Sequence, residues 1–118
     1  MIDFHDLFKN QEGHAFAKGQ TVFKEGERGE HLCIVKSGSI DLIINGKVLH
    51  TFVPGEMFGE MALIDHETRV GTTIAASDSE VIMLDERRFQ FLVQQTPHFA
   101  QQVMKVMAER LRTMSKLA

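Results

Sequence analysis

The chain has 118 residues, of which 43% are hydrophobic and 25% are charged, and its formal net charge is −3. This length and balance predict one globular domain over residues 1–118, with a core large enough to need no disulfides. The negative charge argues against a general affinity for nucleic acid, and the single cysteine excludes an internal disulfide and a cysteine-rich metal site.

Neither a membrane-spanning run of about 18 apolar residues nor a basic leader with an apolar centre is present. The one cysteine, Cys33, lies in the apolar run 32–35, where a buried thiol is expected. We therefore expect a reduced, cytoplasmic protein that does not contact a membrane.

The first two thirds of the chain read as one short helix followed by short strands. Phe4, Leu7 and Phe8 have the i, i+3, i+4 spacing of a helix with one apolar face. Strands are predicted at 21–23, 31–35, 39–44, 47–53, 72–75 and 81–84. Asn45-Gly46 predicts a type I′ hairpin turn, because both positions tolerate a positive φ. Short strands at regular spacing are typical of a small sandwich or jelly-roll barrel.

The last third changes to the helical period. Asp85 is the expected N-cap of a helix that carries Phe89, Leu92 and Val93. Thr96 is then a second N-cap, and Pro97 stands at the first helical position, where its missing N–H costs nothing. No glycine or proline follows, so this helix is expected to run for about 20 residues to the end of the chain.

The terminal helix carries two apolar stripes. The first is formed by Phe99, Val103 and Val106. The second, with alternating spacings of three and four, is formed by Met104, Met107, Leu111, Met114 and Ala118. We expect the first stripe to cover the barrel and the second to be the seam of a homodimer. The alternative is that both stripes form one wide core face.

The segment 58–73 carries the chemistry. Phe58-Gly59-Glu60 opens the run 58–64, which predicts one short helical turn whose free backbone N–H groups favour an anion. Arg69 follows eleven residues after Phe58 and is suited to bidentate phosphate binding. Glu60 is suited to accept a hydrogen bond from a sugar hydroxyl. A structural ion pair between Arg69 and Glu60 explains the same spacing.

The segment 58–73 resembles the phosphate-binding cassette of cyclic-nucleotide-binding domains, and we call it the cassette. Such domains occur in regulatory subunits of cyclic-AMP-dependent protein kinase and in the bacterial catabolite activator family. The similarity extends to 22–27, 31–38, 54–60 and 80–84, and so over nearly the whole chain. It implies an α+β, mainly β fold: an eight-stranded jelly-roll or double-stranded β-helix barrel with a short N-terminal helix, a cassette helical turn and two C-terminal helices.

The resemblance also implies roles for individual residues. Arg69 would bind the exocyclic phosphate, Glu60 the ribose 2′-hydroxyl, and Gly59 would allow close backbone approach. The backbone N–H groups of Met61, Ala62 and Val70 would complete an anion nest. The remaining predicted ligand contacts are Phe58, Gly71, Leu49, Arg110, Leu111, Thr113 and Met114.

Two departures from the family pattern concern the base. The family usually carries Ser, Thr or Ala and then Ala after the arginine, whereas this chain has Val70 and Gly71. Without a hydroxyl there, cyclic AMP is favoured over cyclic GMP as the ligand. The chain also has no Trp or Tyr, so the stacked aromatic lid of the kinase subunits is missing.

Two functions follow as hypotheses. The first is a regulatory sensor that binds a cyclic nucleotide and signals through its terminal helix to a protein effector. The second is a ligand-free protein–protein interaction module with a degenerate pocket. An enzyme is not expected, because the six histidines stand singly and form no metal or catalytic pattern. No direct DNA binding is expected either, because no helix-turn-helix follows the terminal helix within these residues.

Overall fold

The computed structural model describes residues 3–60 and 68–117, without the side chains of Met114, Lys116 and Leu117. Its helices are α1 His5–Phe8, α3 Glu86–Gln95 and α4 Pro97–Leu117. Its strands are β1 His14–Phe16, β2 Thr21–Phe23, β3 His31–Ser37, β4 Ile40–Ile44, β5 Lys47–Phe52, β6 Met57–Phe58, β7 Thr72–Ala75 and β8 Ser79–Asp85.

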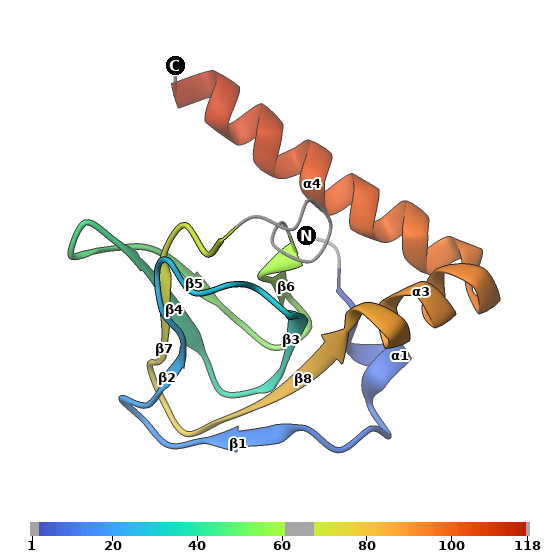
Figure 1. Cartoon of the computed structure of the whole chain (residues 1–118), viewed down its shortest axis with the longest axis horizontal. Helices are drawn as coiled ribbons and strands as arrows, with labels where there is room; N and C mark the ends of the chain where they lie inside the picture. The colour runs from blue at the N-terminus through green and yellow to red at the C-terminus, as the bar shows by residue number, and fades with distance from the viewer. Residues whose placement is uncertain (1–2, 61–67, 118) are drawn as a thin grey trace.

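The described strands form two antiparallel four-stranded sheets. Their orders are β1-β8-β3-β6 and β2-β7-β4-β5, so each sheet joins strands that are distant in sequence. Figure 1 shows α3 and α4 against one end of this barrel, with α4 extending past it. The predicted eight-stranded jelly roll is confirmed. The predicted cassette helical turn falls largely on residues 61–67, which lie outside the described residues.

Local sequence accounts for the main turns and helix starts. Asn45 and Gly46 have φ values of 53° and 75°, which confirms the type I′ turn between β4 and β5. The Asp85 side chain accepts a hydrogen bond from the backbone N–H of Arg88 at 2.7 Å, as an N-cap does. Helix α4 begins at Pro97, as predicted.

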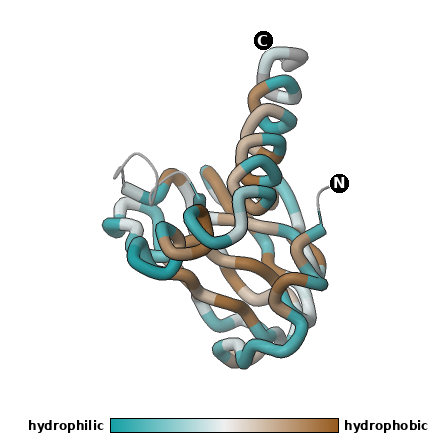
Figure 2. The backbone as a smooth tube through the Cα atoms, turned by 90° about the vertical axis from the view of Figure 1, so that its right-hand side faces the viewer, coloured by the Kyte–Doolittle hydropathy of each residue, from teal (hydrophilic) through white to brown (hydrophobic). Residues whose placement is uncertain are grey.

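Strand β3 divides the core into two parts, because alternate side chains of a strand point to opposite faces. Leu32 and Ile34 pack with α1, α3 and α4, whereas Cys33 and Val35 point into the barrel. Phe99 is central to the helical part, and its ring lies edge-on to three neighbouring rings, at 5.8, 6.3 and 5.9 Å between centroids. Figure 2 shows this arrangement as hydrophobic segments running through the barrel, with hydrophilic turns at its rim.

Helix α4 confirms one apolar stripe and alters the other. Phe99, Val103 and Val106 are buried, as predicted for the face that covers the barrel. Met104 and Leu111, from the second stripe, are 60% and 65% exposed. Met107 instead packs against the core beneath the helices. The heptad assignment of Met107 to an outward seam was therefore wrong, because four residues after Val103 a side chain returns to nearly the same helix face.

Two short strands escaped prediction. β1 has three residues, mostly exposed, and β6 has two, so neither displays an alternating pattern.

Within residues 3–60 and 68–117, not even the 21-residue α4 is apolar enough to cross a bilayer.

Candidate functional site: a cavity between the barrel and α4

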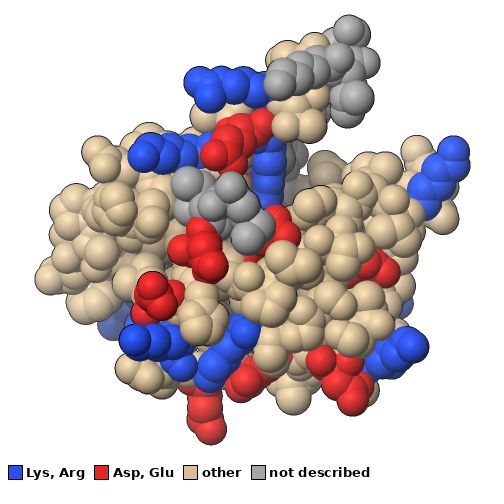
Figure 3. Space-filling model, turned by 180° about the vertical axis from the view of Figure 1, so that it is seen from behind, with Lys and Arg blue, Asp and Glu red and all other residues tan. Residues whose placement is uncertain are grey.

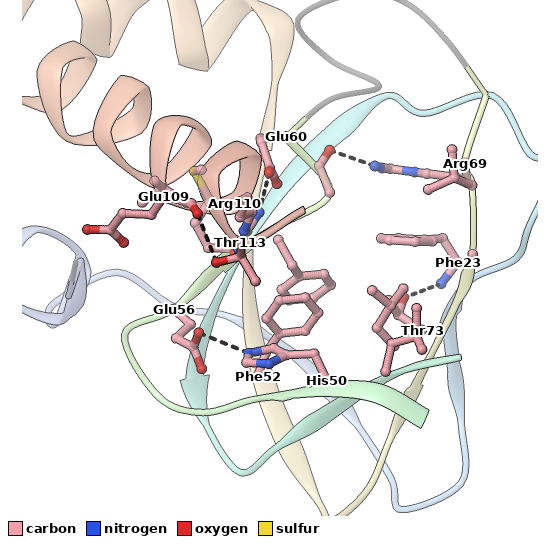
Figure 4. Close-up of a pocket in the computed structure, with 18 of the residues that line it drawn as sticks. Phe23, His50, Phe52, Glu56, Glu60, Arg69, Thr73, Glu109, Arg110 and Thr113 are labelled. Atoms are coloured by element: carbon pink, nitrogen blue, oxygen red, sulfur yellow. Dashed lines mark hydrogen bonds and ion pairs between the residues drawn. The ribbon is translucent and has the colours of Figure 1, made fainter. Parts of the chain in front are cut away.

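A cavity of about 660 Å³ lies between the barrel and α4, within the size range of small-molecule sites. Its wall is mostly apolar and is interrupted by a few charged groups, among them Glu60, Arg69 and Arg110. Figure 4 shows that these groups come from different parts of the chain: Glu60 follows β6, Arg69 precedes β7, and Arg110 belongs to α4. The fold therefore brings these three residues, up to 50 positions apart, into one site.

Arg69 is held in the cavity wall by main-chain oxygens. Its Nη1 donates to the Gly59 carbonyl and its Nη2 to the His31 carbonyl, both at 2.7 Å. The guanidinium carbon lies 4.0 Å from the centre of the Phe23 ring. With 7% of the residue exposed, burial lowers the pKa of Arg69, and nearby groups that include Glu27 and Glu60 oppose this change. Among the described residues, main-chain oxygens engage two of the five guanidinium N–H donors, and the others are suited to an anion.

Gly59 makes this position of Arg69 sterically feasible. Its φ is +74°, a backbone conformation that side chains disfavour. A Cβ placed on it would lie 2.7 Å from Arg69 Nη1 and 3.2 Å from Phe23 Cε2. In this structure the group that closely approaches the Gly59 backbone is therefore the Arg69 guanidinium.

Glu60 is a buried carboxylate, 3% exposed, and its partner comes from the terminal helix. Arg110 donates through Nη1 to Glu60 Oε1 and through Nη2 to the Met57 carbonyl. Among the described residues, the ion-pair partner of Glu60 is therefore Arg110, and the structural pair with Arg69 is not formed. Arg110 was predicted only as a ligand contact, and the structure adds its contact with Glu60, the residue predicted to bind the ribose hydroxyl.

The floor of the cavity is aromatic. Phe23, Phe52 and Phe58 all line the cavity. The Phe52 and Phe58 rings are stacked, with centroids 5.0 Å apart, and Phe23 lies 6.0 Å from Phe58. Phe58 was predicted as a ligand contact, whereas Phe23 and Phe52 were missed because only Trp and Tyr were considered as aromatic partners of the base.

Further polar groups sit at the edge of the floor. His50 Nε2 lies 3.2 Å from Glu56 Oε2, and the His50 ring meets Phe52 edge-on. Both residues line the cavity, and neither was predicted. Exposed acidic and basic side chains are interspersed on the face of the molecule in Figure 3.

The other predicted contacts divide into three groups. Leu49, Val70, Gly71 and Thr113 line the cavity, as expected. Leu111 does not line it; we correct its assignment, because one residue beyond Arg110 the helix has turned by about 100°. Lying outside the described residues are Met61, Ala62 and the side chain of Met114.

The structure explains the glycine that follows Val70. A Cβ on Gly71 would lie 2.8 Å from Ile44 Cγ1 and 2.9 Å from Leu42 Cδ1, so the family's alanine would clash with β4. Val70 is 68% exposed at the mouth of the cavity and does not fill it.

The described side chains do not gather three or more His, Cys, Asp or Glu residues into a group that would hold a metal ion.

We next compared the chain with known proteins. Residues 14–96 match the model of the cyclic nucleotide-binding domain. The chain belongs to this family. All the elements that frame the cavity except α4 lie in the matched range.

Individual relatives agree with this family assignment. The cAMP-dependent protein kinase regulatory subunit of Eremothecium gossypii is 34% identical over 73 residues, which are 62% of this chain and 16% of that protein. The Thermus thermophilus catabolite activator protein superposes with a TM-score of 0.81 at 30% identity, covering 86% of this chain and 50% of that one. A solved structure from a cyclic-GMP-dependent signalling pathway of bacterial phytopathogenesis has a TM-score of 0.79 at 30% identity, with 92% of both chains covered. The chain spans less than half the length of the curated relatives it matches first.

Proposed function

We propose that residues 1–118 form a single sensor domain whose cavity binds a cyclic nucleotide, with cyclic AMP preferred over cyclic GMP. The observation that carries this proposal is the joint placement of Arg69 and Glu60 in the wall of one 660 Å³ cavity. A cyclic nucleotide has an anionic phosphate and a neutral ribose hydroxyl as close neighbours. A guanidinium, with its several N–H donors, beside a carboxylate acceptor is complementary to that pair.

The preference for cyclic AMP rests on the cavity mouth. Val70 offers no hydroxyl there, and Gly71 has no side chain, so these two residues provide only backbone polar groups to the ligand. A guanine has more polar edge atoms to satisfy than such a mouth supplies, and unsatisfied polar groups lower affinity. Adenine needs fewer partners, and Leu49 gives it an apolar surface.

Transmission of the signal is assigned to α4. Arg110 connects this helix to Glu60, so a ligand that engages Glu60 changes the environment of Arg110. We propose that α4 has one position with ligand bound and another without it. The ligand shifts the equilibrium between them only if its affinities for the two differ. A second chain is the partner we propose for the outward face of α4, where Met104 and Leu111 stand seven residues apart. We place the sensor in the cytoplasm, acting on a protein effector without direct DNA contact or membrane attachment.

One observation favours the second candidate function, a ligand-free interaction module. Glu60 already has an ionic partner in Arg110, so its carboxylate accepts a hydrogen bond without any ligand. If that pair never opens, the cavity is a structural remnant.

Thermal unfolding with cyclic AMP, cyclic GMP or AMP separates the two candidates. A nucleotide at about 100 times its dissociation constant stabilises the folded state by ~2.7 kcal/mol, which is several degrees in a domain of this size. We expect the shift with cyclic nucleotides, its loss in Arg69→Ala, and a smaller shift in Glu60→Ala. Arg112→Ala, at an exposed position of α4, is the matched control and keeps the full shift. Unfolding temperatures that do not respond to either cyclic nucleotide would leave the interaction module as the function.

A further inference from the structure

The two arginines of the cavity stand at opposite ends of one row of phenylalanine rings. Arg69 lies over Phe23, with 4.0 Å from its guanidinium carbon to the ring centre. Phe23 neighbours Phe58, which stacks on Phe52. The guanidinium carbon of Arg110 lies 5.6 Å from the centre of the Phe52 ring. Figure 4 shows Arg69 and Phe23 at one side of the cavity and Arg110 above Phe52 at the other.

We infer that Phe23, Phe58 and Phe52 form one shared support that positions Arg69 for the ligand's anionic group and Arg110 for Glu60. This inference rests on the proposed function only where it names a ligand. The positioning of the two arginines is a property of the protein itself. Phe23 and Phe52 are thus positioning residues, and they act through the arginines.

The contacts of Arg69 show why a ring is needed. The two carbonyl oxygens accept from N–H groups on one edge of the guanidinium, so they restrain rotation about that edge less than movement within the guanidinium plane. The face of an aromatic ring opposes this rotation, because it attracts a cation from one side. An aliphatic side chain of similar volume fills the space without that attraction.

The row is also mechanically stiff. Phe58 and Phe52 are buried, and closely packed side chains transmit a displacement to their neighbours. Phe23 is anchored at its backbone, where its N–H donates to the hydroxyl of the buried Thr73 at 3.3 Å. A shift of either terminal ring is therefore passed along the row.

Three substitutions test the role of Phe23. Phe23→Leu removes the ring face, and Phe23→Tyr keeps it; a neighbouring cavity of about 120 Å³, which Phe23 also lines, leaves room for the hydroxyl. Phe16→Leu is the matched control, because Phe16 is half-buried against the same core cluster but does not line the site. The readouts are affinity for cyclic AMP and the NMR signal of the Arg69 side-chain N–H, assigned with Arg69→Lys. We expect Phe23→Leu to weaken binding roughly three- to tenfold and remove the ring-current shift of Arg69, and Phe23→Tyr to restore both.

Phe52→Leu tests whether the support is shared. We expect it to shift the Arg110 signal strongly and the Arg69 signal measurably, and Phe23→Leu to do the reverse. Remote signals that match those of Phe16→Leu would show independent contacts and overturn the shared support. Weakened binding in Phe23→Leu with an unchanged Arg69 signal would make Phe23 a ligand contact and overturn its positioning role. If even the wild-type protein binds no nucleotide, the proposed function fails, while the arginine signals still decide this inference.

Discussion

Arg110 of α4 donates to the buried carboxylate of Glu60, 50 residues earlier in the chain, and to the Met57 carbonyl beside it. This contact ties the terminal helix to the residue that the family resemblance assigns to the ribose. Helix position and ligand chemistry therefore meet at one carboxylate.

Arg110→Met removes the ionic partner of Glu60 and retains most of the side-chain length. A buried carboxylate without its partner is destabilising, and Arg110 itself is 34% exposed at its side chain, so we expect a loss of about 1–3 kcal/mol in the free energy of unfolding. Urea denaturation measures the loss. Arg112→Met, at an exposed position two residues further along α4, controls for the loss of charge. We expect it to change the free energy of unfolding by less than about 0.5 kcal/mol. Equal effects of the two substitutions would show that the Glu60 contact contributes nothing.

Gly59→Ala is expected to disturb the cavity more than its backbone strain alone would. Both Gly59 and Gly26 have positive φ, but a Cβ on Gly26 meets nothing within 4 Å, whereas one on Gly59 meets Arg69. Each alanine costs about 1–2 kcal/mol of strain. Only Gly59→Ala should displace the guanidinium, and we expect it to weaken cyclic AMP binding by about tenfold or more. Calorimetric titration of both variants is the measurement, and similar affinities would contradict the close approach.

Stability at alkaline pH should depend on Cys33. Burial raises the pKa of its thiol from 9.0 to about 12. The folded state therefore holds the proton more tightly than the unfolded chain. Its stabilising contribution is complete below pH 9 and is lost as the pH rises toward 12, with a slope of up to about 1.4 kcal/mol per pH unit.

Cys33→Ala removes this titration. The urea midpoint of the variant should therefore fall less steeply above pH 9 than that of the wild-type protein, even if the midpoint of the variant is lower at neutral pH. The other titratable groups are common to both proteins and cancel in the comparison. Parallel curves would show that the thiol does not contribute.

Val70→Thr adds a hydroxyl at the mouth of the cavity with little change in shape. If it reaches the guanine, one neutral hydrogen bond of about 0.5–1.5 kcal/mol raises the affinity for cyclic GMP relative to cyclic AMP by roughly two- to tenfold. Competition binding with both nucleotides measures the ratio. Val48→Thr, at an exposed position of β5 that does not line the cavity, should leave it unchanged. A ratio that Val70→Thr leaves at the wild-type value would remove Val70 from the explanation of base preference.

Met104→Glu combined with Leu111→Glu tests the dimer seam. Because both side chains are exposed in the single chain, we expect the double variant to halve the mass measured by light scattering without lowering the unfolding temperature. Met107 is unsuitable for this purpose, because it packs on the core. Arg112→Glu, also exposed on α4, serves as the control and should stay dimeric. A wild-type protein that is already monomeric would contradict the seam.

Much of the fold was predictable from local patterns. The Asn45-Gly46 turn, the Asp85 cap and the start of α4 at Pro97 depend on the conformational preferences of two or three adjacent residues. The cassette, with Gly59, Glu60 and Arg69 at family spacing, was recognisable for the same reason, since these residues form one continuous segment. Strands β1 and β6 were missed because they are too short to show a period and are defined by pairing with distant strands.

The sequence by itself determined where most of the strands lie along the chain, the turns between them, and the identity of the charged groups in the cassette. Only the tertiary structure decided which groups meet. The partner of Glu60, the turning of Leu111 away from the cavity and the inward packing of Met107 all depend on the rotation of α4 about its axis, where 100° per residue separates a contact from an exposed position. The row from Arg69 through the three phenylalanines to Arg110 joins β2, β5, β6 and α4 to the segment before β7, and no local pattern encodes that juxtaposition.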